Sequence, residues 1–238
     1  MIEKNLSGRI ENYWDSRSEN FSKKRRLELN GADYFGWQKI FMEHLPGDKN
    51  LKILDVGTGA GFFAIILSKL GHEVVGVDMS AKMIAEAENN SRDFNCNAKF
   101  FKMDAQKLDF ADESFDVVVT RNLTWTLPDV MEAYREWRRV LKVGGLLMNF
   151  DSDYGEKNFN RKICAIEEVS ADEMLLECQQ IKDSLKISTH TRPSFDIGFL
   201  CGINFSVRYA EDISELVHQD KNLQYDSVPM FAIYAKKL

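Results

Sequence analysis

A short apolar run that ends in an acid and leads into alternating glycines constrains this chain more than any other feature. The segment is Leu51-Lys-Ile-Leu-Asp-Val-Gly-Thr-Gly-Ala-Gly-Phe-Phe63. Residues 51–56 are mostly Leu, Ile and Val and are followed by turn residues, which predicts a buried strand. Gly57, Gly59 and Gly61 predict a tight turn into a helix, because a residue without a Cβ lets backbone N–H groups approach a ligand. The segment therefore predicts a nucleotide-type cofactor site.

Two details of the turn bear on which cofactor it would hold. A dinucleotide loop has the spacing G-x-G-x-x-G, whose third glycine allows close helix–strand packing. In this chain Phe62 stands at that third position. Asp55 lies two residues before the first glycine, where a carboxylate would repel a pyrophosphate but would attract an ammonium and a sulfonium. Both details argue against the rival interpretation, an NAD-dependent oxidoreductase.

With Asp55, Gly57, Gly59 and Gly61, the segment resembles the first motif of class I S-adenosylmethionine-dependent methyltransferases, D-x-G-x-G-x-G or a shortened form. Two later stretches, 110–119 and 137–146, resemble the small-molecule branch of that family, which includes ubiquinone and menaquinone methyltransferases. Motifs carry the resemblance over residues 45–150, and the order of elements alone carries it beyond them. The resemblance implies a Rossmann-like sheet of seven strands with the last strand antiparallel.

Predicted strands and helices alternate through the middle of the chain. Apolar runs predict strands at 51–56, 73–77, 98–103, 115–120 and 146–150, and helical patterns occur at 60–70, 80–90 and 128–141. Such alternation predicts a parallel, doubly wound sheet. Residues 142–145 predict a turn before the fifth strand, and two β-type runs close the chain at 204–209 and 229–235.

We expect one methyltransferase domain over residues 1–238, made of four parts. They are a helical cap at 1–45, a cofactor-binding core at 46–151, an insertion at 152–202 and a final strand pair at 203–238. Within the insertion, Ser170 and Glu173 form a capping-box pattern that predicts a helix start. The cap and the insertion are additions to the minimal fold, and families of this kind usually build the substrate site from such additions.

Acids at the predicted strand ends suggest how a cofactor would lie. Asp78 follows the second strand, about 20 residues beyond the glycine turn, where an acid can accept hydrogen bonds from both ribose hydroxyls. A plain helix N-terminal acid is the alternative. The resemblance implies that Asp104 and the N–H of Ala105 face the adenine. The expected cofactor contacts are Asp55, Gly57, Thr58, Gly59, Gly61, Asp78, Met79, Met83, Asp104, Ala105 and Arg121.

The acceptor side is less defined by the sequence. Tyr13 and Trp14 resemble the aromatic N-terminal helix that covers the cofactor in this branch, and core packing is the alternative. Trp125 suits a pocket wall or the core equally. A general base is needed only if the nucleophile stays protonated. His190 is a weak candidate for that base, because a satisfied surface histidine is the commoner situation.

Two further clusters carry weaker signals. Asp151 and Asp153 follow the fifth strand, but two acids without a third ligand predict no metal site. The basic run Lys23–Arg26 predicts a solvated helix face, with contact to an anionic substrate as the alternative.

Composition limits the partners. A net charge of −6 argues against nucleic acid and anionic membranes. The chain also lacks the Asn/Asp-Pro-Pro-Tyr/Phe stretch that methyltransferases of nucleobase amino groups carry after the fourth strand. Four widely spaced cysteines and the lack of a long apolar run predict a cytoplasmic protein.

From these motifs and the composition together, we predict transfer of a methyl group from S-adenosylmethionine to a small molecule. An RNA-modifying methyltransferase and a non-catalytic S-adenosylmethionine-binding module are the alternatives.

Overall fold

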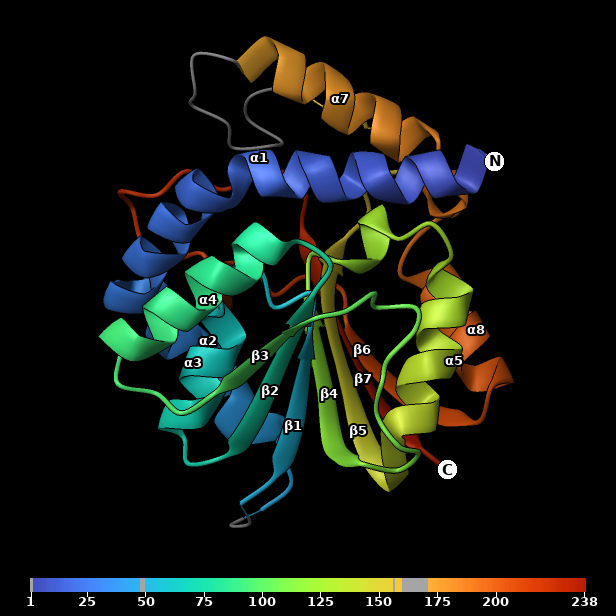
Figure 1. The fold of residues 1–238 in the computed structure, drawn as a ribbon. Coiled ribbons are helices and arrows are strands. Elements are labelled where there is room, and N and C mark those ends of the chain that lie inside the picture. Colours follow the sequence, from blue (N-terminus) through green and yellow to red (C-terminus); the bar gives the residue numbers. More distant parts are fainter. Residues whose placement is uncertain (1, 48–49, 156, 160–170) are drawn as a thin grey trace.

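The computed structural model describes residues 2–47, 50–155, 157–159 and 171–238, and it is built on one seven-stranded sheet (Figure 1). The sheet order is β3-β2-β1-β4-β5-β7-β6. Pairs from β3 to β5 are parallel, whereas β7 is antiparallel to both β5 and β6. The expected seven-stranded sheet with an antiparallel last strand is confirmed. The strands are β1 (Lys52–Val56), β2 (Glu73–Asp78), β3 (Lys99–Lys102), β4 (Phe115–Arg121), β5 (Leu141–Ser152), β6 (Phe205–Ala210) and β7 (Met230–Lys237).

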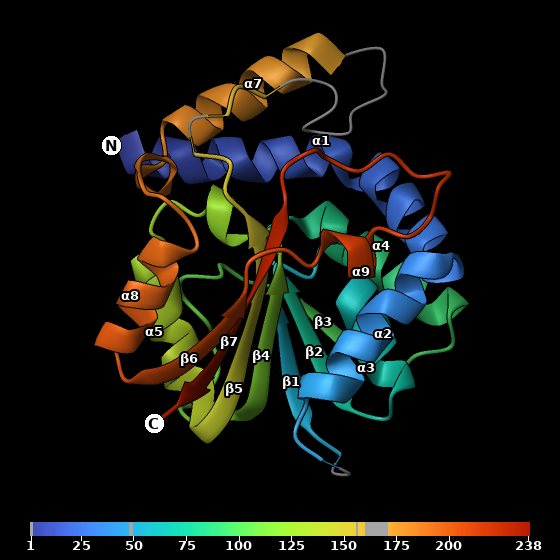
Figure 2. The same ribbon diagram turned by 180° about the vertical axis from the view of Figure 1, so that it is seen from behind.

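Helices cover both faces of the sheet, because successive strand residues point to opposite faces and both sets are apolar. In β1, Leu54 belongs to one buried cluster and Ile53 to the other. The face seen in Figure 2 carries α2 (Ala32–His44), α3 (Phe62–Lys69) and α9 (Ser214–Val217). The other face carries α5 (Val130–Val140), with α8 (Ser194–Gly202) beside it. Helix α4 (Ala81–Asp93) packs along β2 and β3, and its Ile84 and Ala87 belong to the same buried cluster as α2 and α3.

A long N-terminal helix covers the carboxyl ends of the parallel strands. Helix α1 (Ile2–Asn30) crosses this edge of the sheet, and α7 (Ala171–Asp183) lies on its outer side in both views (Figures 1 and 2). Arg9 of α1 donates two hydrogen bonds to the carboxylate of Glu177 on α7, at 2.9 and 2.8 Å. Toward the other end of α1, Arg26 bonds Asp93 of α4 at 2.7 Å. Helices therefore cover the edge of the sheet at which parallel strands bind ligands.

Three local expectations differ from the structure. The helical region expected up to residue 45 is two helices, because α1 ends before Gly31 and α2 begins after it. The turn expected at 142–145 lies inside β5, where the pairing with β4 shifts register between Phe115 and Val117 and Gly144 adopts φ +75°. Helix α8 follows the loop that carries His190 and was not predicted. The predicted cap at Ser170 lies outside the described residues.

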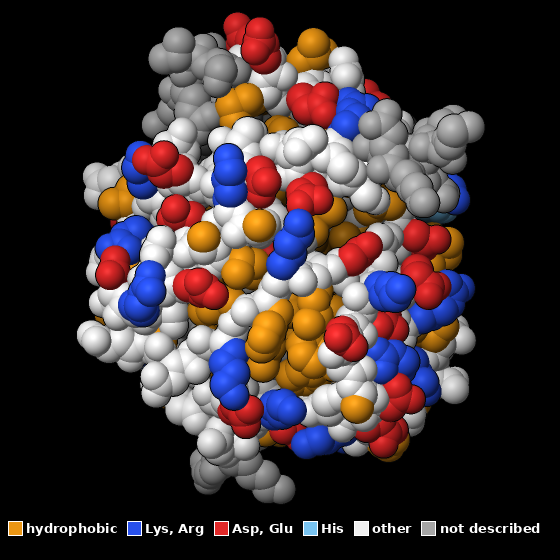
Figure 3. All heavy atoms as spheres, in the orientation of Figure 1, with side chains coloured by type: hydrophobic (Ala, Val, Ile, Leu, Met, Phe, Trp, Pro, Cys, Tyr) orange, Lys and Arg blue, Asp and Glu red, His pale blue; other side chains and the backbone are white. Residues whose placement is uncertain are grey.

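The face in Figure 1 is not fully covered by helices. The segment between β3 and β4 forms no helix, and Figure 3 shows hydrophobic side chains at the surface between α4 and α5. The edge strand β3 carries Phe101, which is 43% exposed.

Within the described part of the chain, no helix is both long and apolar enough to span a membrane.

Candidate active site

A cavity of about 480 Å³ lies beneath α1 at the carboxyl ends of the strands. Its volume is in the range typical of small-molecule sites. The segments that follow β1, β2, β3, β4 and β5 contribute to its wall, together with α1 and the chain that leads into β7. The expected cofactor and substrate residues on the wall are Tyr13, Trp14, Gly57, Gly59, Asp78, Met79, Met83, Asp104, Ala105, Arg121 and Trp125.

The glycine turn after β1 is compact and closely covered. Gly57 and Gly59 have φ of +67° and +52°, a region that L side chains rarely adopt. A Cβ on Gly59 would lie 3.0 Å from the ring of Phe21 on α1, and one on Gly57 would lie 2.8 Å from Leu123. Gly61, with φ +84°, is the N-cap of α3 and packs against Ala87 of α4. Gly57 and Gly59 therefore border the cavity, whereas Gly61 serves the packing of the helices.

Asp55 lies behind the turn and does not line the cavity. Its Oδ2 accepts hydrogen bonds from the Thr58 hydroxyl at 2.6 Å and from the N–H of Ala64 at 3.1 Å. The side chain is thus committed to holding the turn and the first turn of α3. Burial raises the pKa of Asp55 to about 7, and the two hydrogen bonds oppose that shift. The structure does not place Asp55, Thr58 or Gly61 where they would touch a ligand in the cavity, which differs from the direct contact expected of them.

Asp78, at the end of β2, does face the cavity. Its Oδ2 accepts from the N–H of Gly59 at 3.0 Å, and its Oδ1 accepts from the N–H of Ser80 at 2.9 Å. Burial raises the pKa of Asp78 to about 6 against these two bonds. Since a carboxylate oxygen can accept more than one hydrogen bond, both oxygens keep capacity for ligand hydroxyls. Asp15 of α1 bonds the Ser80 hydroxyl at 2.5 Å and so ties α1 to this side of the cavity.

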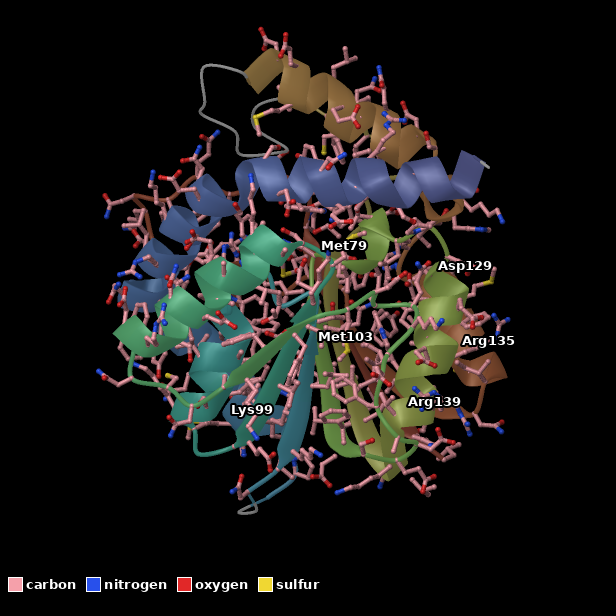
Figure 4. All side chains as sticks on the ribbon, viewed as in Figure 1. Met79, Lys99, Met103, Asp129, Arg135 and Arg139 are labelled. Atoms are coloured by element: carbon pink, nitrogen blue, oxygen red, sulfur yellow. The ribbon has the colours of Figure 1, made fainter. Side chains whose placement is uncertain are left out.

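The segment after β3 forms the far wall. Asp104 is exposed, and its Oδ1 accepts from the backbone N–H of Gln106 at 2.9 Å. Ala105 is buried, and its carbonyl accepts from the Trp137 indole at 2.9 Å, which fixes the segment to α5. Figure 4 shows Met79 and Met103 between α4 and α5, below α1, and both line the cavity. This wall therefore offers apolar thioethers beside one carboxylate.

Positive charge gathers on the part of the wall that α1 and the end of β4 provide. Glu28 lies between two guanidinium groups, 2.8 Å from Arg25 and 2.9 Å from Arg121, and all three side chains are at most 9% exposed. Burial alone would raise the pKa of Glu28, but the charges of Arg121 and Arg25 hold it below its ordinary value. Burial lowers the pKa of Lys24 to about 8. Three members of the basic run Lys23–Arg26, namely Lys23, Lys24 and Arg25, thus line the cavity with Arg121, although a solvated face was expected.

An aromatic cluster forms the wall beyond β4. The rings of Trp125, Tyr154 and Phe159 contact one another edge to face, with centroids 5.2 to 5.5 Å apart. Trp125 is 8% exposed and was predicted as a candidate, whereas Tyr154 and Phe159 were not. The positions of these three residues in the sequence follow no pattern that indicates a site. They come together because the 3₁₀ helix η1 (Thr124–Thr126) packs beside the end of β5.

The segment that leads into β7 was also missed. Asn222, Leu223, Gln224 and Asp226 line the cavity. The carbonyl of Gln224 accepts from Lys24 at 2.5 Å, and Oδ2 of Asp226 accepts from the Tyr154 hydroxyl at 3.0 Å. These residues follow no helical or strand period, so no pattern in the sequence indicated them.

His190 lies away from the cavity. It is exposed, and its ring stacks on Phe195 at 4.0 Å between centroids. The structure therefore gives no support to His190 as a base and matches the alternative of a surface histidine.

Asp151 takes part in a buried ion-pair network outside the cavity wall. Arg192 contacts Asp151 at 3.2 Å and Asp196 at 2.8 Å, and all three side chains are at most 2% exposed. Asp151 also accepts hydrogen bonds from the Thr124 hydroxyl and from the N–H of Trp125. The carboxylate of Asp151 is thus paired with a guanidinium and with hydrogen-bond donors. Among the described residues, no group of three or more His, Cys, Asp or Glu side chains could hold a metal ion.

A doubly wound sheet with a glycine turn after its first strand and a cavity across its strand ends is typical of nucleotide-cofactor-binding α/β proteins. Residues 54–149 match a family model described as a methyltransferase domain. A demethylmenaquinone methyltransferase of Staphylococcus aureus is 36% identical over 115 residues, 47% of each chain. A demethylmenaquinone methyltransferase of Chlorobaculum parvum is 31% identical over 150 residues, 61% of this chain and 60% of that one.

Solved structures support the same fold over nearly the whole chain. A SAM-dependent methyltransferase from Aquifex aeolicus superposes with a TM-score of 0.62 at 19% identity, covering 94% of this chain and 98% of that one. The [4+2]-cyclase SpnF superposes with a TM-score of 0.56 at 20% identity, covering 84% of this chain and 80% of that one. Residues 54–149 are therefore similar to a methyltransferase domain, and the matched sequences span about half to three-fifths of the curated relatives.

Proposed function

We propose that this chain is an enzyme that transfers the methyl group of S-adenosylmethionine to a small-molecule acceptor and releases S-adenosylhomocysteine. One observation carries the proposal. A single cavity joins Gly57, Gly59, Asp78 and Asp104 at the ends of three neighbouring strands and then continues past β4 to Tyr154. Such a cavity has space for a cofactor and for a second molecule beside it.

The residues on the wall fit the chemistry of this cofactor. The carboxylate of Asp78 suits ribose hydroxyls, and the thioethers of Met79 and Met83 suit an apolar ring face. The segment Asp104–Gln106 would face the adenine. Arg121, at the end of β4, would hold the cofactor's own carboxylate. Asp55 would act through Thr58, by keeping the glycine turn in shape.

When bound, the cofactor supplies an electrophilic methyl group. The protein's part is to bind both partners, to align them and to exclude water, and alignment alone can lower a barrier by several kcal/mol. Helix α1 would exclude water, since its residues Tyr13 and Trp14 face the cavity. The parts expected at 1–45 and 152–202 would therefore build the acceptor side.

The relatives named as demethylmenaquinone methyltransferases support an acceptor with a flat apolar body, and so do the aromatic rings of Trp125, Tyr154 and Phe159. We assign no nucleic-acid partner, because the net charge is −6. The free cysteines Cys96, Cys178 and Cys201 are consistent with a cytoplasmic protein.

The test is a screen of metabolite extracts with the full chain and labelled S-adenosylmethionine, followed by mass analysis of the labelled product. The proposal predicts label in a small organic molecule together with an equal amount of S-adenosylhomocysteine. Label in RNA would favour the RNA-modifying alternative. Binding of S-adenosylhomocysteine without turnover of any acceptor would favour the non-catalytic module.

A further inference from the structure

The part of the cavity wall beyond β4 contains a carboxylate that the cofactor does not need. Three carboxylates of the described residues line the cavity, namely Asp78, Asp104 and Asp226. Asp78 and Asp104 follow β2 and β3, on the side that we assign to the cofactor. Asp226 precedes β7. The first residue of β7, Met230, is paired with Ser152 at the end of β5. Asp226 and Tyr154 therefore meet above the neighbouring strands β5 and β7.

The sheet order separates these two regions. Strands lie about 4.8 Å apart, so the ends of β3, β2, β1 and β4 span roughly 14 Å, about the length of an extended nucleoside with an amino-acid tail. The ends of β5 and β7 lie one and two strands beyond β4. A group at that position faces the space left for the acceptor.

Asp226 is held as a hydrogen-bond acceptor. Its Oδ2 accepts from the Tyr154 hydroxyl at 3.0 Å, and its Oδ1 accepts from the N–H of Val228 at 3.2 Å. Burial raises the pKa of Asp226, and the bonds from Tyr154 and Val228 and the charges of Lys24 and Arg121 oppose the rise. The pKa of Tyr154 is well above its ordinary value because of burial and the nearby carboxylates, so Tyr154 remains the donor.

The other acid near these cations is a poor base. Glu28 is paired with Arg25 and Arg121, which hold its pKa low. Lys24 donates one hydrogen bond to the Gln224 carbonyl and has further N–H donors. An oxyanion that formed beside Asp226 would thus have the positive charges of Lys24 and Arg121 nearby.

We propose that Asp226 is the proton acceptor for a hydroxyl-bearing aromatic acceptor, a phenol or enol, that binds against Trp125, Tyr154 and Phe159. This inference rests on the proposed function. The acceptor oxygen forms a bond to the methyl carbon as the bond from that carbon to sulfur breaks, and the electron pair of that bond goes to sulfur. The hydroxyl proton goes to the Asp226 carboxylate and then to solvent. The products are a methyl ether and S-adenosylhomocysteine.

The first experiment needs no turnover. The full chain is saturated with S-adenosylhomocysteine and titrated with 1-naphthol, whose anion absorbs at longer wavelength than the neutral form, over a range of pH. The proposal predicts that bound naphthol ionises at lower pH in Asp226→Asn than in the wild type, because a carboxylate beside the hydroxyl disfavours a second negative charge. Ionisation at the same pH in both proteins, or no binding of naphthol, would overturn it.

The second experiment measures turnover with labelled S-adenosylmethionine on the matched pair 1-naphthol and 1-naphthylamine. The naphthol should be methylated, and Asp226→Asn should lower kcat by about a hundredfold and remove the acidic limb of the pH profile. The KM for S-adenosylmethionine should stay within about twofold, because Asp226 lies outside the region assigned to the cofactor. Tyr154→Phe should lower kcat less, by about tenfold, since it keeps the ring and loses the hydroxyl that positions Asp226.

The amide in Asp226→Asn keeps one oxygen that can accept from Tyr154 or from Val228, so the fold should persist, and binding of S-adenosylhomocysteine checks this. Asp212→Asn is the matched control, because Asp212 caps the chain at Ser214 outside the cavity. Methylation of the amine but not of the naphthol would reject this inference and leave the proposed function standing. Failure of the wild type to bind S-adenosylhomocysteine would reject both.

Discussion

At the scale of single residues, the carboxylates near the glycine turn divide into two kinds. Asp78 faces the cavity and keeps acceptor capacity, whereas Asp55 is 2% exposed and bonds Thr58 and Ala64 behind the turn. Both were expected from the sequence to touch the cofactor. The two acids differ because β1 is a central strand, and an acid near its end is enclosed by α3. The end of β2, in contrast, is open toward α1.

For Asp78 we predict that Asp78→Ala weakens S-adenosylhomocysteine binding at least about tenfold, because charged hydrogen bonds are worth more than about 1.4 kcal/mol. Since burial raises its pKa to about 6, the wild-type affinity should also fall as the pH is lowered through that value. Titration calorimetry measures both effects. Glu132→Ala, at the exposed surface of α5, is the control and should leave the affinity unchanged. An unchanged dissociation constant in a folded Asp78→Ala protein would remove Asp78 from the site.

For Asp55 we predict an effect on stability rather than on contact. Burial raises its pKa in the folded protein to about 7, above the value of about 3.9 in an unfolded chain. The folded state then binds this proton more readily, so the free energy of unfolding falls as the pH rises from about 4 to about 7. Asp55→Asn cannot ionise and lacks that fall.

Urea unfolding of the ligand-free proteins measures this difference. Between about pH 5 and about pH 8, the stability of Asp55→Asn relative to the wild type should improve by on the order of 2 kcal/mol. A relative stability that is the same at both pH values would show that Asp55 does not titrate in this range.

At the scale of elements, a buried ion-pair network positions part of the acceptor wall. Arg192, at the start of the segment that forms α8, joins Asp196 of α8 to Asp151 of β5. Asp151 in turn accepts from the N–H of Trp125 at 3.0 Å and so fixes η1. The loop before α8 was noted in the sequence for His190, but the residue that organises it is Arg192.

We predict that Arg192→Met lowers the free energy of unfolding by about 3 to 5 kcal/mol, because it leaves two buried carboxylates without their cation. In thermal unfolding this corresponds to a fall in Tm of roughly 10 °C for a chain of this size. The control is Arg135→Met, since Arg135 pairs with Glu132 at the surface and both side chains are more than half exposed. That control should cost less than about 1 kcal/mol. Equal losses in the two variants would show that the buried network has no special role in stability.

The core elements were predictable from the sequence, whereas the cavity's outer wall was not. The runs that became β1, β2 and β4 are short, apolar and bounded by turn residues, and these signals are local. The inclusion of 142–145 in β5 was missed, because Gly144 and Gly145 indicate a turn and only the pairing with β4 makes them a bulge. Tyr154 and Asp226 were missed because their proximity depends on the pairing of β5 with β7.

At the scale of the whole molecule, the proposed cofactor region and the proposed acceptor region lie side by side beneath α1. The carboxyl ends of β1, β2, β3 and β4 line the proposed cofactor region, and the end of β5 with the chain before β7 lines the proposed acceptor region. Helix α1 covers both and is tied to α4 by Arg26 and to α7 by Arg9. The [4+2]-cyclase SpnF shares this fold, so the fold alone does not decide the reaction.

We expect this cavity to bind S-adenosylmethionine and not a dinucleotide. Titration calorimetry of the full chain with S-adenosylhomocysteine and, separately, with NADH tests it directly. We predict saturable binding of one S-adenosylhomocysteine per chain and no heat from NADH beyond that of dilution. Saturable binding of NADH without binding of S-adenosylhomocysteine would contradict it.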